Sequence, residues 1–168
     1  MKKLALVPAN VAVLHEKTKK IPLATIVQAD FQKLIDEMIY TMYEENGIGL
    51  AATQVGKDIA LATLVPDPHR FDFYKNGSRE AIVIINPTIA NTSIRSKSED
   101  EGCLSVPGFV GTVKRHSAVT VQFTDRDGTT QTVKARGLLA HVFQHEIDHL
   151  NGTLFLDRAE KLFKIEHA

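Results

Sequence analysis

The chain has 168 residues, which is enough for one domain with a sizeable hydrophobic core. Its 20 basic and 20 acidic residues give a formal net charge of zero, which argues against a basic nucleic-acid-binding surface or an anionic-membrane surface. The single cysteine excludes an internal disulfide, and no apolar run is long enough for a signal peptide or a membrane span, so we expect one cytoplasmic domain over residues 1–168.

The first strong periodic pattern lies between Leu23 and Asn46. Apolar side chains recur there every three or four residues, which predicts a long amphipathic helix that buries one face. This apolar stripe consists of Val27, Phe31, Leu34, Ile35, Met38 and Met42. Asn46 and Gly47 then end the helix, because both residue types tolerate a positive φ. Before this helix we expect irregular structure.

A segment of small and apolar residues follows, from Gly47 to Gly56. Its glycines allow another chain to approach the backbone closely, and Gln54 is its only amide side chain. Taken alone, the pattern favours a tight turn that leads into a strand, with Gln54 bonded to the loop backbone.

The middle of the chain predicts antiparallel β-structure, because short runs of β-branched residues alternate with turn residues. We expect strands at residues 59–65, 81–85, 88–96, 110–114, 118–124 and 130–135, a surface loop at 66–79 and a hairpin turn at 125–128. A second helix is predicted over residues 137–150, and the tail from Thr153 predicts a short apolar run with one helical turn. The fold class is therefore α+β, with antiparallel sheets packed around the C-terminal helix.

This C-terminal helix carries His145, Glu146 and His149. Residues four apart lie on one helix face, about 6 Å apart along the axis, so the two imidazoles can bind one metal ion. Glu146 can reach a water on that ion without being a ligand, which makes it the candidate general base. The alternative is a solvated helix face that happens to carry two histidines.

Cys103 lies 42 residues before His145 and is flanked by glycine and proline breaks. A lone cysteine is often inert and buried, but beside histidines it is also a candidate metal ligand or nucleophile. One thiolate and two imidazoles leave a fourth position for water, which is typical of catalytic metal sites. His141 and His149 are about 12 Å apart along the axis, so we interpret His141 as pocket wall.

Three stretches together resemble the motifs of the peptide deformylases, in the order found in that family. They are Gly47-Ile48-Gly49-Leu50-Ala51-Ala52-x-Gln54, Glu101-Gly102-Cys103-Leu104-Ser105 and Gln144-His145-Glu146-x-Asp148-His149. The resemblance extends from the first helix to about Leu156. It implies a metal-dependent hydrolase that removes the formyl group from N-formylmethionyl nascent peptides and releases formate. It also implies Fe²⁺ as the physiological ion, with Zn²⁺, Ni²⁺ or Co²⁺ able to replace it, although the ligand types alone do not select iron.

The resemblance assigns roles to the motif residues. Cys103, His145 and His149 bind the metal, while Glu146 takes a proton from the attacking water and returns it to the departing amine. The Gln54 amide and the Leu104 backbone N–H donate to the developing oxyanion.

The substrate backbone is expected to pair as an added strand, with Gly49 as the point of close approach and Gly108 on the opposite rim. The candidate substrate-binding residues are Gly47, Ile48, Gly49, Gly108, Leu138, His141 and Val142. For the aliphatic members of this set, ordinary core packing is an equally good interpretation. Beyond the site, Glu101 is expected to accept a proton from a ligand histidine and Asp148 to pair with Arg115, with a surface ion pair as the alternative for either residue.

The chain also departs from the pattern of the family it resembles. Glu99 and His141 stand where aliphatic side chains are common, which predicts a relaxed or pH-dependent preference for methionine. The chain ends soon after Lys161, without the long C-terminal helix of some bacterial members, so ribosome docking is unsupported and we expect a monomer. A metallopeptidase, another amidohydrolase and a catalytically silent peptide-binding domain are the rival functions.

Overall fold

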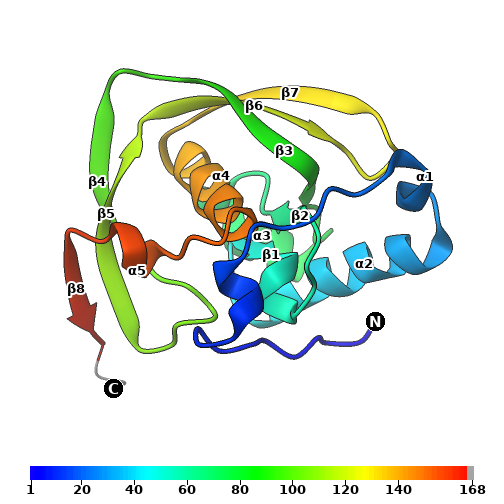
Figure 1. Cartoon of the computed structure of the whole chain (residues 1–168), viewed down its shortest axis with the longest axis horizontal. Helices are drawn as coiled ribbons and strands as arrows, with labels where there is room; N and C mark the ends of the chain where they lie inside the picture. The colour runs from blue at the N-terminus through cyan, green and yellow to red at the C-terminus, as the bar shows by residue number, and fades with distance from the viewer. Residues whose placement is uncertain (166–168) are drawn as a thin grey trace.

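Two antiparallel sheets surround one buried helix in the computed structural model, which describes residues 1–165 (Figure 1). The larger sheet has the order β1-β2-β3-β6-β7, with β1 (Gly49–Ala51), β2 (Leu61–Leu64), β3 (Ile82–Thr92), β6 (Ala118–Thr124) and β7 (Thr130–Arg136). The smaller has the order β4-β5-β8, with β4 (Ser96–Glu101), β5 (Phe109–His116) and β8 (Lys161–Lys164). The fold is therefore a mixed α and β fold with antiparallel sheets.

The buried helix is α4 (Gly137–Leu150), which lies at the centre of Figure 1 with β4 and β5 on one side and β6 and β7 on another. Every residue from Ala140 to Leu150 is buried. Phe143 packs against Phe123 of β6, with ring centroids 6.3 Å apart. Because these residues are buried, the polar side chains among them need partners within the protein.

The long N-terminal helix differs from the prediction of one helix between Leu23 and Asn46. It is divided into α1 (Leu23–Ile26) and α2 (Ala29–Glu44), because Gln28 is extended at φ −73° and ψ 138°. The amide of Gln32 holds the break by donating to the carbonyls of Ile26 and Arg126. Val27, expected in the buried stripe, is 71% exposed, so the buried face of α2 begins at Phe31.

Strand β3 also differs from the prediction, which placed separate strands at residues 81–85 and 88–96. The chain forms one strand with a register shift between Ile85 and Thr88. Asn86 adopts a φ of 53° there, and its amide bonds to both the backbone N–H and the carbonyl of Ile21. The Asn86-Pro87 turn signal thus marks a bulge inside a strand rather than the end of one.

Other segments were missed because their patterns are weak. The loop expected at residues 66–79 contains η3 (Pro68–Arg70) and α3 (Phe71–Asn76), and η1 (Ala12–His15) lies in the segment expected to be irregular. Strands β4 and β8 are polar or exposed and lack an apolar alternation, so their pairing with β5 decides their structure. The tail forms α5 (Phe155–Arg158) before β8.

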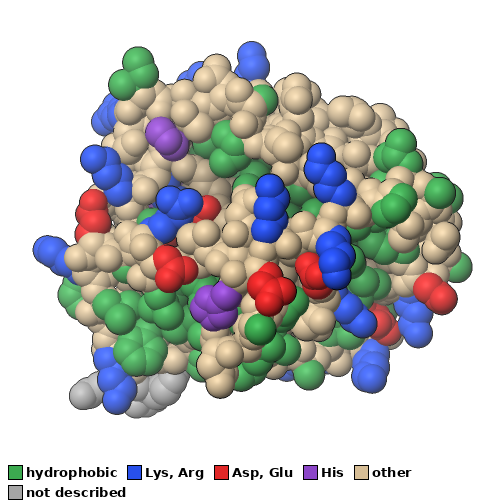
Figure 2. All heavy atoms as spheres, in the orientation of Figure 1, with side chains coloured by type: hydrophobic (Ala, Val, Ile, Leu, Met, Phe, Trp, Pro, Cys, Tyr) green, Lys and Arg blue, Asp and Glu red, His purple; other side chains and the backbone are tan. Residues whose placement is uncertain are grey.

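The surface carries charges of both signs. Figure 2 shows Lys and Arg side chains interspersed with Asp and Glu side chains over one face, without a broad patch of one sign. Within residues 1–165, no helix has the length and apolar character that crossing a bilayer requires.

Candidate metal centre and active site

The fold brings Cys103 beside His145 and His149. The ligand atoms of these three residues all lie within 4.8 Å of one another, and Cys103 Sγ lies 3.2 Å from His149 Nε2. Ligand bonds of about 2.0–2.3 Å from each atom to a common ion are compatible with that spacing. Within residues 1–165, no fourth His, Cys, Asp or Glu joins this group. The donor set therefore suits a divalent transition-metal ion with a coordination position left over.

Cys103 lies in the loop between β4 and β5, close to the end of the smaller sheet. A tight turn, in which the Val106 N–H donates to the Cys103 carbonyl at 2.9 Å, holds the loop. The Gln54 Nε2 donates to Cys103 Sγ at 3.4 Å. The thiol is thus placed by one sheet and the two imidazoles by α4.

A buried network orients His145. Its Nδ1 lies 2.7 Å from Glu101 Oε2, and Arg115 donates to Glu101 through Nε and Nη2. Arg115 also donates to Asp148 at 2.7 Å, and Arg158 reaches the same carboxylate. The predicted contacts of Glu101 and Asp148 are therefore confirmed. Because Nδ1 is engaged by the carboxylate, Nε2 is the ring nitrogen left for a metal.

Electrostatics in this network favour a charged Glu101. Burial raises its pKa, but the contacts with His141, His145 and the Arg115 guanidinium outweigh burial and hold the pKa well below its usual range. Burial tends to lower the pKa of His145, yet Cys103 and Glu101 raise it to about 10. For His149 burial dominates, so its pKa lies well below the ordinary value and the ring is neutral.

Glu146 points into the same site from α4 and is 3% exposed. Its Oε2 has no hydrogen-bond partner among the described residues, and its Oε1 packs against Gly49 of β1. Burial raises the pKa of Glu146 to about 7. A carboxyl that titrates near neutrality is suited to both accepting and returning a proton.

The glycine-rich segment meets both other motifs. The Gln54 Oε1 accepts from the Ala51 N–H at 2.8 Å, which fixes the amide so that its nitrogen faces Cys103. A Cβ on Gly47 would lie 2.8 Å from Leu104 Cδ1. A side chain at either glycine would thus displace a residue of another motif, Leu104 at Gly47 and Glu146 at Gly49.

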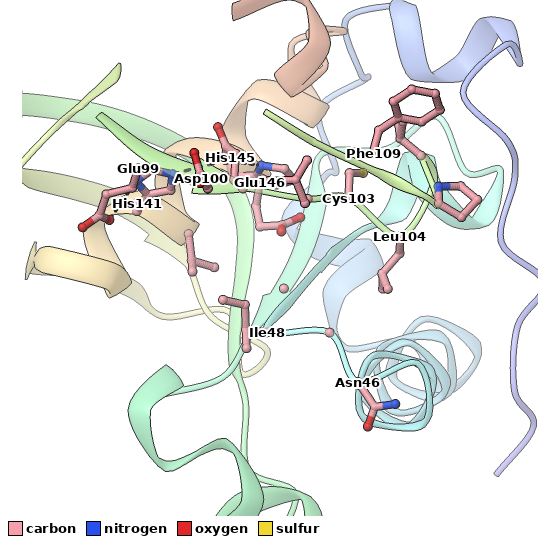
Figure 3. Close-up of a pocket in the computed structure, with 18 of the residues that line it drawn as sticks. Asn46, Ile48, Glu99, Asp100, Cys103, Leu104, Phe109, His141, His145 and Glu146 are labelled. Carbon is pink, nitrogen blue, oxygen red and sulfur yellow. Dashed lines mark hydrogen bonds and ion pairs between the residues drawn. The ribbon is translucent and has the colours of Figure 1, made fainter. Parts of the chain in front are cut away.

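A cavity of about 480 Å³ opens over this cluster (Figure 3). Every predicted substrate-binding residue lines it, namely Gly47, Ile48, Gly49, Gly108, Leu138, His141 and Val142. The remaining predicted site residues on its wall are Gln54, Cys103, Leu104, His145 and Glu146. In Figure 3, Glu99 and His141 lie together at one end of the labelled residues, and Phe109 lies at the other.

Several lining residues were missed by the sequence analysis: Asn46, Asp100, Val106, Pro107, Phe109, Val110 and Ile165. Phe109 is the first residue of β5, one position before the predicted strand, and its ring is partly exposed in the structure. Ile165 follows β8, a strand without a predictive pattern, so nothing in the sequence pointed to it.

Comparison with known proteins identifies the family. The family model described as polypeptide deformylase matches residues 1–164. The chain belongs to the polypeptide deformylase family. A peptide deformylase of Rhizobium meliloti is 45% identical over 142 residues, which is 84% of this chain and 77% of the relative. A peptide deformylase of Chlorobium luteolum is 48% identical over 150 residues, which is 89% of this chain and 74% of the relative.

Solved deformylase structures have the same fold. A peptide deformylase from Legionella pneumophila superposes with a TM-score of 0.84 at 37% identity and covers 95% of this chain and 87% of that one. A peptide deformylase from Synechococcus elongatus, solved in complex with actinonin, superposes with a TM-score of 0.82 at 36% identity and covers 95% and 83%. As a deformylase, the chain is a metal-dependent hydrolase that removes the N-formyl group from nascent peptides.

Proposed function

We propose that Cys103, His145 and His149 hold the divalent ion of this deformylase and that residues 1–168 form a single catalytic domain around the metal-binding helix α4. The convergence of three ligand atoms within 4.8 Å carries this proposal. Fe²⁺ is the proposed physiological ion, with Zn²⁺, Ni²⁺ or Co²⁺ as substitutes. The proposed substrates are N-formylmethionyl nascent peptides, which a monomer deformylates in the cytoplasm.

Glu146 carries the proton in the proposed reaction. When bound, the ion supplies Lewis-acid polarisation and lowers the pKa of water beside it. The Glu146 carboxylate accepts a proton from the water whose oxygen attacks the formyl carbon. The same carboxyl then protonates the departing nitrogen as the C–N bond breaks, so the products are formate and a free amine. The unpaired Oε2 of Glu146 supports this role.

The Gln54 amide and the Leu104 N–H stabilise the negative charge that develops on the formyl oxygen. The Ala51 N–H fixes the Gln54 side chain before substrate arrives, so little reorganisation is needed. Loss of one such donor typically lowers the rate by about 10²–10³.

Strand β1 provides the proposed docking edge for the peptide. Among the described strands it pairs only with β2, so its other edge is available for an extended peptide. Gly49 lies on this edge beside Glu146. The first side chain of the peptide then enters the cavity along Ile48, Leu138 and Val142, with Gly47 behind the peptide and Gly108 on the opposite rim.

The test is formate release from N-formyl-Met-Ala-Ser by anaerobically purified protein of measured metal content, beside the unformylated peptide. We expect formate release with about one ion per chain. Glu146→Ala should abolish turnover and keep the ion, whereas Cys103→Ala should lose the ion. Cleavage of the unformylated peptide would instead support a metallopeptidase. Peptide binding without turnover in the metal-loaded protein would support a silent binding domain.

A further inference from the structure

The proposed first-residue pocket is apolar along its walls but charged at one end, where Glu99 and His141 lie (Figure 3). This relationship follows from the secondary structure. Glu99 and Glu101 share one face of β4 because strand side chains alternate, and His141 and His145 share one face of α4 because they are four residues apart. The two carboxylates of β4 therefore lie against the two histidines of α4, with Glu101 beside His145 and Glu99 beside His141.

The Glu101 carboxylate already has hydrogen-bond partners other than His141. Its carboxylate accepts from the His145 ring at 2.7 Å and from the Arg115 guanidinium at 2.9 Å. His141 Nε2 lies 3.3 Å from Glu101 Oε2, but it makes no hydrogen bond with any described residue. His141 is nevertheless only 7% exposed.

Glu99 is in a similar position. One of its carboxylate oxygens pairs with the Lys97 ammonium, and the other lies 3.5 Å from His141 Nδ1 without forming a hydrogen bond. The Glu99 side chain is 31% exposed, so it borders the cavity rather than the closed interior. The charged end thus presents a carboxylate acceptor at the cavity border, and His141 Nδ1 faces that carboxylate at 3.5 Å.

We propose that Glu99 and His141 are specificity-determining residues of this deformylase, and that they favour a first side chain of methionine length that ends in a hydrogen-bonding group. This inference rests on the proposed function. The amide of glutamine matches the pair, because its NH₂ can donate to Glu99 and its carbonyl can accept from the imidazole N–H. A purely apolar tip would displace water from Glu99 and His141 without replacing the hydrogen bonds of that water.

The expected preference is measurable with three peptides that differ only at the first side chain. They are N-formyl-Gln-Ala-Ser, N-formyl-norleucine-Ala-Ser and N-formyl-Met-Ala-Ser, and the readout is kcat/KM for formate release. In the unaltered protein the glutamine peptide should match or exceed the norleucine peptide. Removing the polar pair in a Glu99→Ile, His141→Leu double variant should lower the glutamine-to-norleucine ratio by about 10- to 100-fold.

Further variants separate recognition from structural effects. Glu99→Gln and His141→Asn keep hydrogen-bonding groups at the pocket end and should keep most of the ratio. Ser98→Ala, whose exposed hydroxyl contacts Glu160, serves as the control on β4 and should leave the ratio unchanged. Because both peptides share the same chemistry, a general loss of metal or of active protein lowers both kcat/KM values and cancels in the ratio.

The outcomes distinguish a failure of this inference from a failure of the proposed function on which it rests. Formate release with a glutamine-to-norleucine ratio that the double variant leaves unchanged would overturn the specificity role alone. A ratio far below one in the unaltered protein would do the same. Failure of the metal-loaded protein to release formate from all three peptides would overturn the proposed function, and this inference with it.

Discussion

A Cβ atom on Gly49 would lie 2.2 Å from Oε1 of Glu146, so the backbone of β1 packs directly against the proposed general base. This contact joins the glycine-rich motif to the metal-binding motif. It explains the glycine by packing, since Gly49 has no positive φ that would require one. The same residue borders the edge at which we propose that the peptide docks.

Replacing Gly49 by alanine should therefore impair catalysis more than folding. The added methyl group must displace the Glu146 carboxylate, and a displacement of about 1 Å can lower a rate by about 10². We expect kcat to fall by about that factor while the metal stays bound, as measured by formate release and metal analysis. Gly128→Ala, at a hairpin φ of 84°, is the control that loses some stability but no activity. Equal activity of the two variants would count against the contact.

Glu101→Gln should weaken metal binding without unfolding the chain. The amide keeps the shape of Glu101 but removes the charge that orients His145 and pairs with Arg115. Loss of such a partner typically lowers metal affinity by about 10- to 100-fold. Competition with a chelator would measure the change. Asp100→Asn is the control: the Asp100 carboxylate accepts a hydrogen bond from the Thr112 hydroxyl, away from the metal ligands, so the affinity should stay near its original value.

Metal binding should release a proton from His145. In the metal-free protein its pKa is about 10, so the ring is protonated at pH 7.5 and must become neutral to bind an ion. The affinity should accordingly rise with pH and level off as pH approaches 10. Calorimetry in buffers of different ionisation enthalpy counts the released protons. Glu101→Gln keeps all three ligands but removes a group that raises the pKa of His145, so this variant should release fewer protons at pH 9. An unchanged proton count would contradict the assignment.

Asn86→Ala should destabilise the fold at a distance from the site. The substitution removes two hydrogen bonds to the Ile21 backbone and forces alanine into a φ of 53°. We expect a loss of about 2–4 kcal/mol in the free energy of unfolding, as measured by urea denaturation. Asn86→Gly relieves the backbone strain but not the lost bonds, so it should be less destabilised. If alanine proves as stable as asparagine, the bulge does not depend on this side chain.

Apolar periodicity and turn residues predicted the helices and strands whose ends depend on neighbouring residues in the sequence. The expected helix over residues 137–150 coincides with α4, and the strand over residues 118–124 coincides with β6. Both carry strong apolar patterns and clear turn residues at their ends. The break at Gln28, the continuity of β3 past Asn86 and the strands β4 and β8 were missed, because each depends on contacts with distant residues.

The sequence by itself determined that His145 and His149 share a helix face with Glu146 between them, since a 3.6-residue repeat is a local property of the chain. It also placed the three motifs that resemble the deformylases, and the family match agrees with that reading. Only the tertiary structure decided that Cys103 meets the two imidazoles, that Gly49 contacts Glu146 and that Glu99 and His141 close one end of the cavity. These contacts depend on how β1 and β4 pack around α4, and no short-range pattern encodes such packing.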